Sequence, residues 1–166
     1  EEEGTPIMSK TGHSYIKECM QQENALLGGE MSGHIFFNDR WPGFDDGIYA
    51  GARMLEIISN LSEEEDVFKD IPELVSTPEI NLATTDEKKF KIVEEFISKA
   101  NYANCTSILI DGVRIESDTA WGLLRASNTS PNLVLRFEAD TKENLELMKN
   151  NFKKTLSEIS PSLGDF

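Results

Sequence analysis

Apolar residues recur with a helical period in four stretches of the chain, and their spacing predicts four amphipathic helices. Positions three, four and seven residues apart share one helix face, which can then pack against a core. We expect helices at residues 13–22, from Asp45 or Asp46 onward, at 86–99 and from about residue 140. The inward positions are Ile16, Cys19 and Met20; Ile48, Ala52, Leu55 and Ile58; Phe90, Val93, Phe96 and Ile97; and Leu145, Met148, Phe152 and Leu156.

Short apolar runs between these helices predict strands. Two lie in the first third of the chain, and the later ones lie at residues 79–83, 107–110, 113–116, 121–124 and 133–137. Asp111-Gly112 indicates a two-residue hairpin turn between two of them. The resulting order, β-α-β-β-β-β-α, predicts an α+β domain with an antiparallel sheet of four to five strands and both helices on one face.

A change of composition separates the two halves of the chain. An acidic run from Ser62 to Asp66 is followed by Pro72 and Pro78, and prolines interrupt regular structure. We therefore expect a linker at 62–77 between a first part at 1–61 and a second at 78–166. The acidic run itself is typical of a solvated surface.

The overall charge excludes one class of partner. The net charge of -14 argues against nucleic acid, because a phosphate backbone requires a basic protein surface. Residues 101–166 are the least acidic part, with 9 acids and 7 bases, which is compatible with binding a small anion there.

Cysteines and hydropathy indicate the compartment. The two cysteines, Cys19 and Cys105, are far apart and form neither a disulfide framework nor a zinc motif. No apolar run reaches membrane-spanning length, and the acidic start Glu1-Glu2-Glu3-Gly4 is unlike a secretion signal. We expect a soluble cytoplasmic protein without a membrane partner, whose first residues are a frayed end or a cut in a longer protein.

The segment Arg125-Ala126-Ser127-Asn128-Thr129 is a candidate phosphate-binding loop. Arginine offers a planar pair of donors that matches a phosphate, and the hydroxyls, the amide and backbone N–H groups can add further donors. The same residues, followed by Pro131, are also typical of an ordinary hairpin turn. These five residues leave both interpretations open.

A second candidate loop runs from Gly28 to His34 and carries Glu30 and Ser32. Glycines at both ends allow a close approach to a ligand, and a carboxylate can accept bonds from two sugar hydroxyls. The alternative is a glycine-rich turn with a buried histidine. Lys10 and His13 lie at a predicted helix N-terminus, a place that favours anions.

Asp45-Asp46, at the start of the second helix, could form a metal pair, but capping and helix-dipole interactions explain the two aspartates better.

Three motifs together resemble the phosphomannomutase/phosphoglucomutase branch of the α-D-phosphohexomutases. They are Lys10-Thr11-Gly12-His13; Gly29-Glu30-Met31-Ser32-Gly33-His34 with Phe44-Asp45-Asp46-Gly47; and Gly122-Leu123-Leu124-Arg125-Ala126-Ser127-Asn128-Thr129. The resemblance covers nearly the whole chain in the family's order and spacing. Enzymes of this family have four domains around one cleft. It implies that residues 1–61 are the C-terminal half of domain 3, an α/β fragment, and that residues 78–166 are domain 4.

The resemblance also implies roles for particular residues. Glu30 and Ser32 would hold two sugar hydroxyls, whereas Lys10 would face the cleft. His13 and His34 are the candidates for proton transfer or phosphate contact. The phosphate away from the reacting end would be bound by Arg125, Ser127, Asn128 and Thr129.

The chemical half of such an enzyme is absent from this chain. By resemblance, the intact protein would interconvert mannose or glucose 1- and 6-phosphates as an intramolecular phosphotransferase in carbohydrate metabolism, with glucose 1,6-bisphosphate as activator. It would use a phosphoserine from domain 1 and Mg²⁺ held by an Asp-x-Asp-x-Asp motif in domain 2, and neither motif occurs here. We therefore expect no metal ligands in this chain.

The partners implied are hexose phosphates and the missing N-terminal domains of the same protein. The chain alone is expected to be inactive, and a non-catalytic sugar-phosphate-binding module is the alternative. Half a domain would also leave an apolar face uncovered in residues 1–60.

Overall fold

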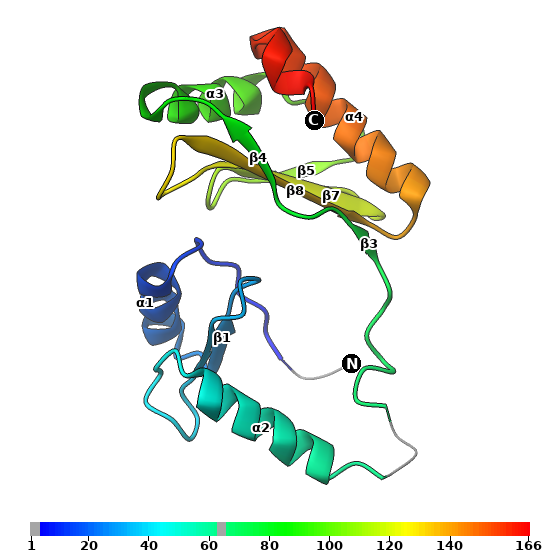
Figure 1. Cartoon of the computed structure of the whole chain (residues 1–166). Helices are drawn as coiled ribbons and strands as arrows, with labels where there is room; N and C mark the ends of the chain where they lie inside the picture. The colour runs from blue at the N-terminus through cyan, green and yellow to red at the C-terminus, as the bar shows by residue number, and fades with distance from the viewer. Residues whose placement is uncertain (1–3, 63–65) are drawn as a thin grey trace. The chain divides into compact units, whose positions relative to one another are not determined.

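A computed structural model describes residues 4–62 and 66–166, and these form two compact units, Glu1–Pro72 and Glu73–Phe166 (Figure 1). Each unit has a hydrophobic core of its own. The N-terminal unit combines α1 (His13–Glu23), β1 (Leu27–Gly29), β2 (Ile35–Phe37) and α2 (Gly47–Ser59). The expected order of elements in the first part of the chain is therefore present. Glu63, Glu64 and Glu65 of the expected acidic surface run lie outside the described residues.

The core of the N-terminal unit is small. Strands β1 and β2 form an antiparallel hairpin with Leu27 opposite Phe37. Phe36 is fully buried and packs with Ile16 and Met20 from the inner face of α1, so two of the three positions predicted for that face are buried.

Helix α2 forms where the sequence predicts it, but none of its residues is buried. Its apolar positions are left open, with Ile48 89% and Leu55 67% exposed. Within the described residues of the N-terminal unit no element covers this face, which agrees with the expectation of an uncovered apolar surface in this part of the chain. Asp46 caps the helix by accepting from the backbone N–H groups of Ile48 and Tyr49.

The C-terminal unit is an α+β sandwich of one sheet and two main helices. Its elements are β3 (Val75–Ser76), β4 (Ile80–Ala83), α3 (Asp86–Lys99), β5 (Thr106–Ile108), β6 (Val113–Glu116), β7 (Ala120–Ala126), β8 (Asn132–Ala139), α4 (Lys142–Ile159) and a short 3₁₀-helix (Pro161–Gly164). The sheet is antiparallel, with β5, β6, β7 and β8 in order and both β3 and β4 paired to β8. As Figure 1 shows, α3 and α4 both lie on one face of this sheet, as predicted.

Alternation along the central strands explains that one-sided packing. In β7, residues Ala120, Gly122, Leu124 and Ala126 are buried, whereas the residues between them are half-buried on the opposite face. Gly122 allows the close approach of α4, because a Cβ there would lie 2.7 Å from the ring of Phe152. The core gathers the rings of Phe96, Phe137 and Phe152, with the Phe96 and Phe152 centroids 4.9 Å apart.

Three details differ from the sequence predictions. Val75–Ser76, at the end of the expected linker, is a strand, since it pairs with Ala139 and Glu138. Strand β5 ends at Ile108 and β6 begins at Val113, so the hairpin at Asp111-Gly112 is longer than the two-residue turn expected. Strand β7 extends to Ala126, so Arg125 belongs to a strand and not to a loop.

Helix α3 packs a different face against the core than the sequence predicts. Phe90 was expected to point inward but is 56% exposed, whereas Lys89 is 5% exposed and occupies the inward position with Ile92, Val93 and Phe96.

Candidate functional site

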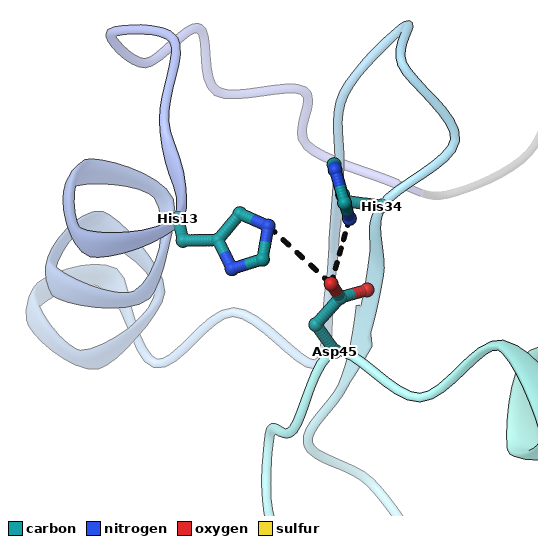
Figure 2. A group of neighbouring side chains, drawn as sticks. All are labelled: His13, His34 and Asp45. Atoms are coloured by element: carbon teal, nitrogen blue, oxygen red, sulfur yellow. Dashed lines mark hydrogen bonds and ion pairs between the residues drawn. The ribbon is translucent and has the colours of Figure 1, made fainter.

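The two histidines of the chain lie next to each other in the N-terminal unit (Figure 2). His13 is the first residue of α1, and His34 immediately precedes β2. Their ring centroids are 4.3 Å apart, and the His13 ring also packs edge-on against buried Phe36 at 5.3 Å. The side chains are 47% and 43% exposed, so a ligand can reach both rings.

Asp45 joins the two histidines. Its Oδ2 lies 2.6 Å from Nδ1 of His34 and 3.3 Å from Nε2 of His13. Asp45 stands just before α2, where a single β-bridge with Phe36 holds its backbone. The expectation that both aspartates act at the helix cap is correct for Asp46 and wrong for Asp45, whose carboxylate turns toward the imidazoles.

This arrangement suits proton exchange. When the Nδ1–H of His34 donates to the Asp45 carboxylate, Nε2 keeps its lone pair and can accept a proton from a ligand. The carboxylate oxygen Oδ2 also lies near a ring nitrogen of each histidine, so one acceptor faces both rings. The three residues can therefore orient and hold a proton at an exposed surface.

The His13–His34–Asp45 group also has the spacing of a metal site. Its ligand atoms lie within 4.8 Å of one another, and it is the one such group of three or more found among residues 4–62 and 66–166. Two imidazoles and one carboxylate suit a transition metal, whereas Mg²⁺ prefers an octahedron of oxygen ligands. This group is therefore a poor match for Mg²⁺.

The loop between β1 and β2 carries the predicted sugar-binding residues. The N–H of Glu30 donates to the carbonyl of His34, and the N–H of Gly33 donates to the carbonyl of Glu30. Gly33 adopts a φ of 89°, which glycine tolerates best. This tight turn brings a carboxylate oxygen of Glu30 to 4.0 Å from Nε2 of His34, while Ser32 at its tip is exposed.

Lys10 does not join this group. It is exposed, and its ammonium lies 5.7 Å from the ring centre of Tyr15. A hollow of about 620 Å³ in the same unit is lined by Glu30 and by apolar residues such as Ile16 and Met20. Neither histidine lines that hollow.

The predicted phosphate-binding residues lie at one end of the C-terminal unit. Arg125 is in β7, one residue before its end, and its Nη1 lies 4.0 Å from Oδ2 of Asp111. Ser127 is buried, and its Oγ accepts from the N–H groups of Thr129 and Ser130. Asn128 and Thr129 are exposed at the loop tip.

This geometry qualifies the role expected for Ser127. Its oxygen is an acceptor within the loop, since the Ser130 hydroxyl also lies 2.8 Å away as a donor. The Ser127 hydroxyl proton remains as the group that can donate to an anion. Ser127 therefore shapes the loop in addition to any contact with a ligand.

The sequence did not reveal the contact of Asp45 with the histidines or any role for Lys89. The Lys89 ammonium donates to the carbonyls of Ser127 and Ser130 at the base of the predicted phosphate loop. Its signal in the sequence is a lysine at the first position of an apolar stripe that continues through Ile92, Val93 and Phe96.

The two units match two consecutive models of one protein family. Residues 1–77 match "Phosphoglucomutase/phosphomannomutase, alpha/beta/alpha domain III", and residues 79–155 match "Phosphoglucomutase/phosphomannomutase, C-terminal domain". Among the part of the chain that the structure describes, no helix is long and apolar enough to cross a membrane.

Named relatives agree with these matches. The chain is 52% identical over 161 residues to a phosphomannomutase/phosphoglucomutase of Pseudomonas aeruginosa, and 49% identical over 162 residues to a phosphoglucomutase of Neisseria meningitidis. Both alignments cover 96% of this chain and 35% of the relative. The chain thus spans about a third of the length of the curated relatives that it matches.

A solved structure gives the same picture. A phosphoglucomutase/phosphomannomutase family protein from Burkholderia thailandensis superimposes with a TM-score of 0.85 at 41% identity. The superposition covers 94% of this chain and 33% of that one.

Proposed function

Because the chain belongs to the phosphoglucomutase/phosphomannomutase family, as its C-terminal domains III and IV, we propose that it supplies substrate-binding groups to a phosphohexomutase. The whole protein would be an isomerase that interconverts hexose 1- and 6-phosphates through a bisphosphate intermediate, in carbohydrate metabolism. Glucose and mannose phosphates are the substrates that fit the names of its relatives.

The observation that most supports this proposal is the end of the β7–β8 hairpin. Arg125 is partly exposed at the end of β7, beside two exposed loop residues with donor groups, Asn128 and Thr129. The buried ammonium of Lys89 holds the backbone of this loop by a hydrogen bond to the carbonyl of Ser127. A rigid set of donors around one guanidinium suits a phosphate, because little order is lost on binding. We assign the phosphate that does not react to this loop.

The groups of the N-terminal unit would act on the sugar. Glu30 can accept from two adjacent sugar hydroxyls, and Ser32 can donate or accept beside it. His34, oriented by Asp45, would take the proton from the hydroxyl that becomes phosphorylated, or would return it. His13 and Lys10 would contribute positive charge toward the phosphate.

The remaining chemistry belongs to parts outside this chain. In this proposal a phosphoserine and Mg²⁺ come from N-terminal domains, with glucose 1,6-bisphosphate as activator. When bound, Mg²⁺ would neutralise charge on the transferred phosphoryl group. Every step assigned to the present chain is one of binding, orienting or proton transfer, so the chain alone would not turn over substrate.

A titration with glucose 1-phosphate tests the binding role. We expect amide signals of residues 125–129 to shift at millimolar ligand, because one charged contact contributes only about 1.5–3 kcal/mol. Arg125→Ala should abolish the response. Arg114→Ala is the matched control, because its guanidinium is engaged by Glu116 and by the Trp121 ring at 3.8 Å.

Two further results would change the proposal. An unchanged loop spectrum in the wild-type chain at saturating glucose 1-phosphate would contradict the binding role. Mutase activity of the purified 166-residue chain in a coupled assay would contradict the assignment of the chemistry to other domains.

A further inference from the structure

Lys89 carries a charge into the interior of the C-terminal unit. It is 5% exposed, whereas the neighbouring residues Lys88 and Phe90 are exposed. A buried ammonium is costly unless each of its three protons has an acceptor. The position therefore demands a compensating set of oxygen atoms.

Three acceptors surround the ammonium. Nζ lies 2.7 Å from the carbonyl oxygen of Ser127, 3.1 Å from that of Ser130 and 2.7 Å from Oδ1 of Asp86. Two of the three are backbone atoms of the loop 127–131, the connection between β7 and β8 that we call the β7–β8 loop. All three ammonium protons are thus accounted for, and two of them hold the loop.

These contacts decide which way the loop presents its polar atoms. Lys89 binds the carbonyls of Ser127 and Ser130, and the N–H of Thr84 binds the carbonyl of Pro131 at 2.9 Å. Three carbonyl oxygens of the loop therefore point toward β4 and α3. Carbonyl oxygens repel an anion, so holding them inward leaves the outer side of the loop to donor groups.

The β7–β8 loop is also closed on itself. The N–H of Ser127 donates to the carbonyl of Asn132, and the Ser127 hydroxyl oxygen accepts from the loop N–H groups of Thr129 and Ser130. Asn128 and Thr129 protrude between the two carbonyls that Lys89 holds. The Lys89 ammonium thus links the two ends of this turn, through the carbonyls of Ser127 and Ser130.

We propose that Lys89 is a positioning residue that fixes the β7–β8 loop in its phosphate-binding form without touching the phosphate itself. This inference rests on the phosphate-binding role proposed above. It assigns part of the affinity for phosphate to a buried lysine in α3, outside every motif that marks the site in the sequence.

The test compares neutral replacements at two adjacent lysines. Lys89→Met removes the charge and the donors, and Lys89→Gln removes the charge but keeps a polar end too short to reach both carbonyls. Lys88→Met and Lys88→Gln are the matched controls, because they remove the same charge from an exposed position of the same helix. The probes are inorganic phosphate and glucose 1-phosphate, followed by amide shifts of residues 125–131 in the full chain.

We expect phosphate affinity to fall about tenfold or more in the Lys89 variants, as loss of bonds from a charged donor predicts, and to stay within about twofold of wild type in the Lys88 variants. We also expect faster backbone motion at residues 127–131 in the ligand-free Lys89 variants. The dispersion of the amide spectrum shows whether each variant folds. If Lys89→Met does not fold, the phosphate affinity of Lys89→Gln is used in its place.

Two other outcomes would overturn the inference in distinguishable ways. Wild-type affinity in a folded Lys89 variant with a lowered melting temperature would make Lys89 a purely structural residue, while leaving the proposed function intact. A wild-type loop that does not respond to either probe would overturn the proposed function and the inference together.

Discussion

Oδ2 of Asp45 lies 2.6 Å from Nδ1 of His34, and because a carboxylate can only accept, this contact favours the ring tautomer that carries its proton on Nδ1. The opposite nitrogen, Nε2, is the one directed toward Glu30, at 4.0 Å from its carboxylate. A histidine whose tautomer is fixed by one partner offers a defined acceptor to a ligand. The pair is therefore the part of the N-terminal unit best arranged for proton transfer.

Replacing Asp45 should release the tautomer of His34. In Asp45→Ala we expect the Nδ1–H form of the neutral ring to lose several-fold in population, since a hydrogen bond to a charged group is worth about 1.5–3 kcal/mol before water competes for the exposed ring. Long-range ¹H–¹⁵N correlation spectra measure this directly, and only two imidazoles contribute signals. Asp46→Ser is the control, because serine also caps helices. The same tautomer in wild type and Asp45→Ala would show that Asp45 does not orient the ring.

Gly112 should be sensitive to a single added methyl group. Its φ is 71°, and a Cβ would lie 2.3 Å from the carbonyl oxygen of Leu124 and 2.7 Å from Cα of Arg125. Overpacking of this kind typically costs 1–3 kcal/mol, and moving β7 would also shift Arg125. We expect Gly112→Ala to lower the free energy of unfolding of the C-terminal unit by about 1–3 kcal/mol and to weaken phosphate binding.

A second glycine separates the clash from the backbone strain at Gly112. Gly43 has the same φ of 71°, but its Cβ would meet only a side-chain oxygen of Asn38 at 3.7 Å. Fluorescence in urea can follow each unit separately in variants that keep one tryptophan, since Trp41 lies in the N-terminal unit and Trp121 in the C-terminal unit. If Gly43→Ala and Gly112→Ala lower the free energy of unfolding of their units equally, backbone strain alone would explain the effect. The close contact of a Cβ at residue 112 with β7 would then contribute nothing.

The helices were the part of the fold most open to prediction. The helix expected at 86–99 is Asp86–Lys99, because Val93, Phe96 and Ile97 recur at helical spacing. The rotation of that helix was not predictable from hydrophobicity, since burying Lys89 requires acceptors that other segments supply. Val75–Ser76 was missed for a related reason, because two residues have no period and become a strand only by pairing with β8.

Within the candidate site, the sequence motifs located the loops but not all of the contacts. His13 and His34 come together because α1 and β2 share the small core around Phe36. Their link through Asp45 was missed, because an aspartate before a helix is normally explained by capping, and here Asp46 alone performs it. Such details depend on side-chain directions that neighbouring segments decide together.

Asp39 should give the N-terminal unit an acid-dependent stability. Nη1 of Arg53 lies 2.8 Å from Oδ1 of Asp39, and this hydrogen bond lowers the pKa of the carboxyl from 3.8 to about 2. Because the pKa of Asp39 is lower in the folded state than in the unfolded chain, the ionised carboxyl stabilises the fold at any pH above the ordinary pKa of 3.8. This stabilisation is lost as the pH falls from about 4 through about 2. The link joins the loop after β2 to helix α2.

Asp39→Asn tests this dependence. We expect the variant to be less stable than wild type at neutral pH, with the difference shrinking as the pH falls from about 4 through about 2. Trp41 fluorescence during urea unfolding reports on this unit. Asp66→Asn is a control outside this ion-pair cluster. A stability difference that stays constant down to pH 2 would rule out ionisation of Asp39 as its source.

Tyr102 should make the C-terminal unit sensitive to alkali. Its hydroxyl donates to the carbonyl of Asn151 at 3.0 Å and lies 2.9 Å from Oγ1 of Thr155, both in α4. Burial raises the pKa of the phenol from 10.0 to about 12. For a group whose pKa is raised in the folded state, the stabilisation is fully present below pH 10 and is lost as the pH rises through 12.

Tyr102→Phe removes both the bond to α4 and the ionisable proton. Near neutral pH we expect the variant to be about 1 kcal/mol less stable, the usual net value of one hydrogen bond. Because phenylalanine does not ionise, the difference should narrow between pH 10 and 12, as wild type loses stability and the variant does not. Trp121 fluorescence during urea unfolding measures this difference in stability. The control is Tyr15→Phe, which replaces an exposed tyrosine. A difference that widens above pH 10 would contradict the raised pKa, because it would mean that the folded state favours the ionised phenol.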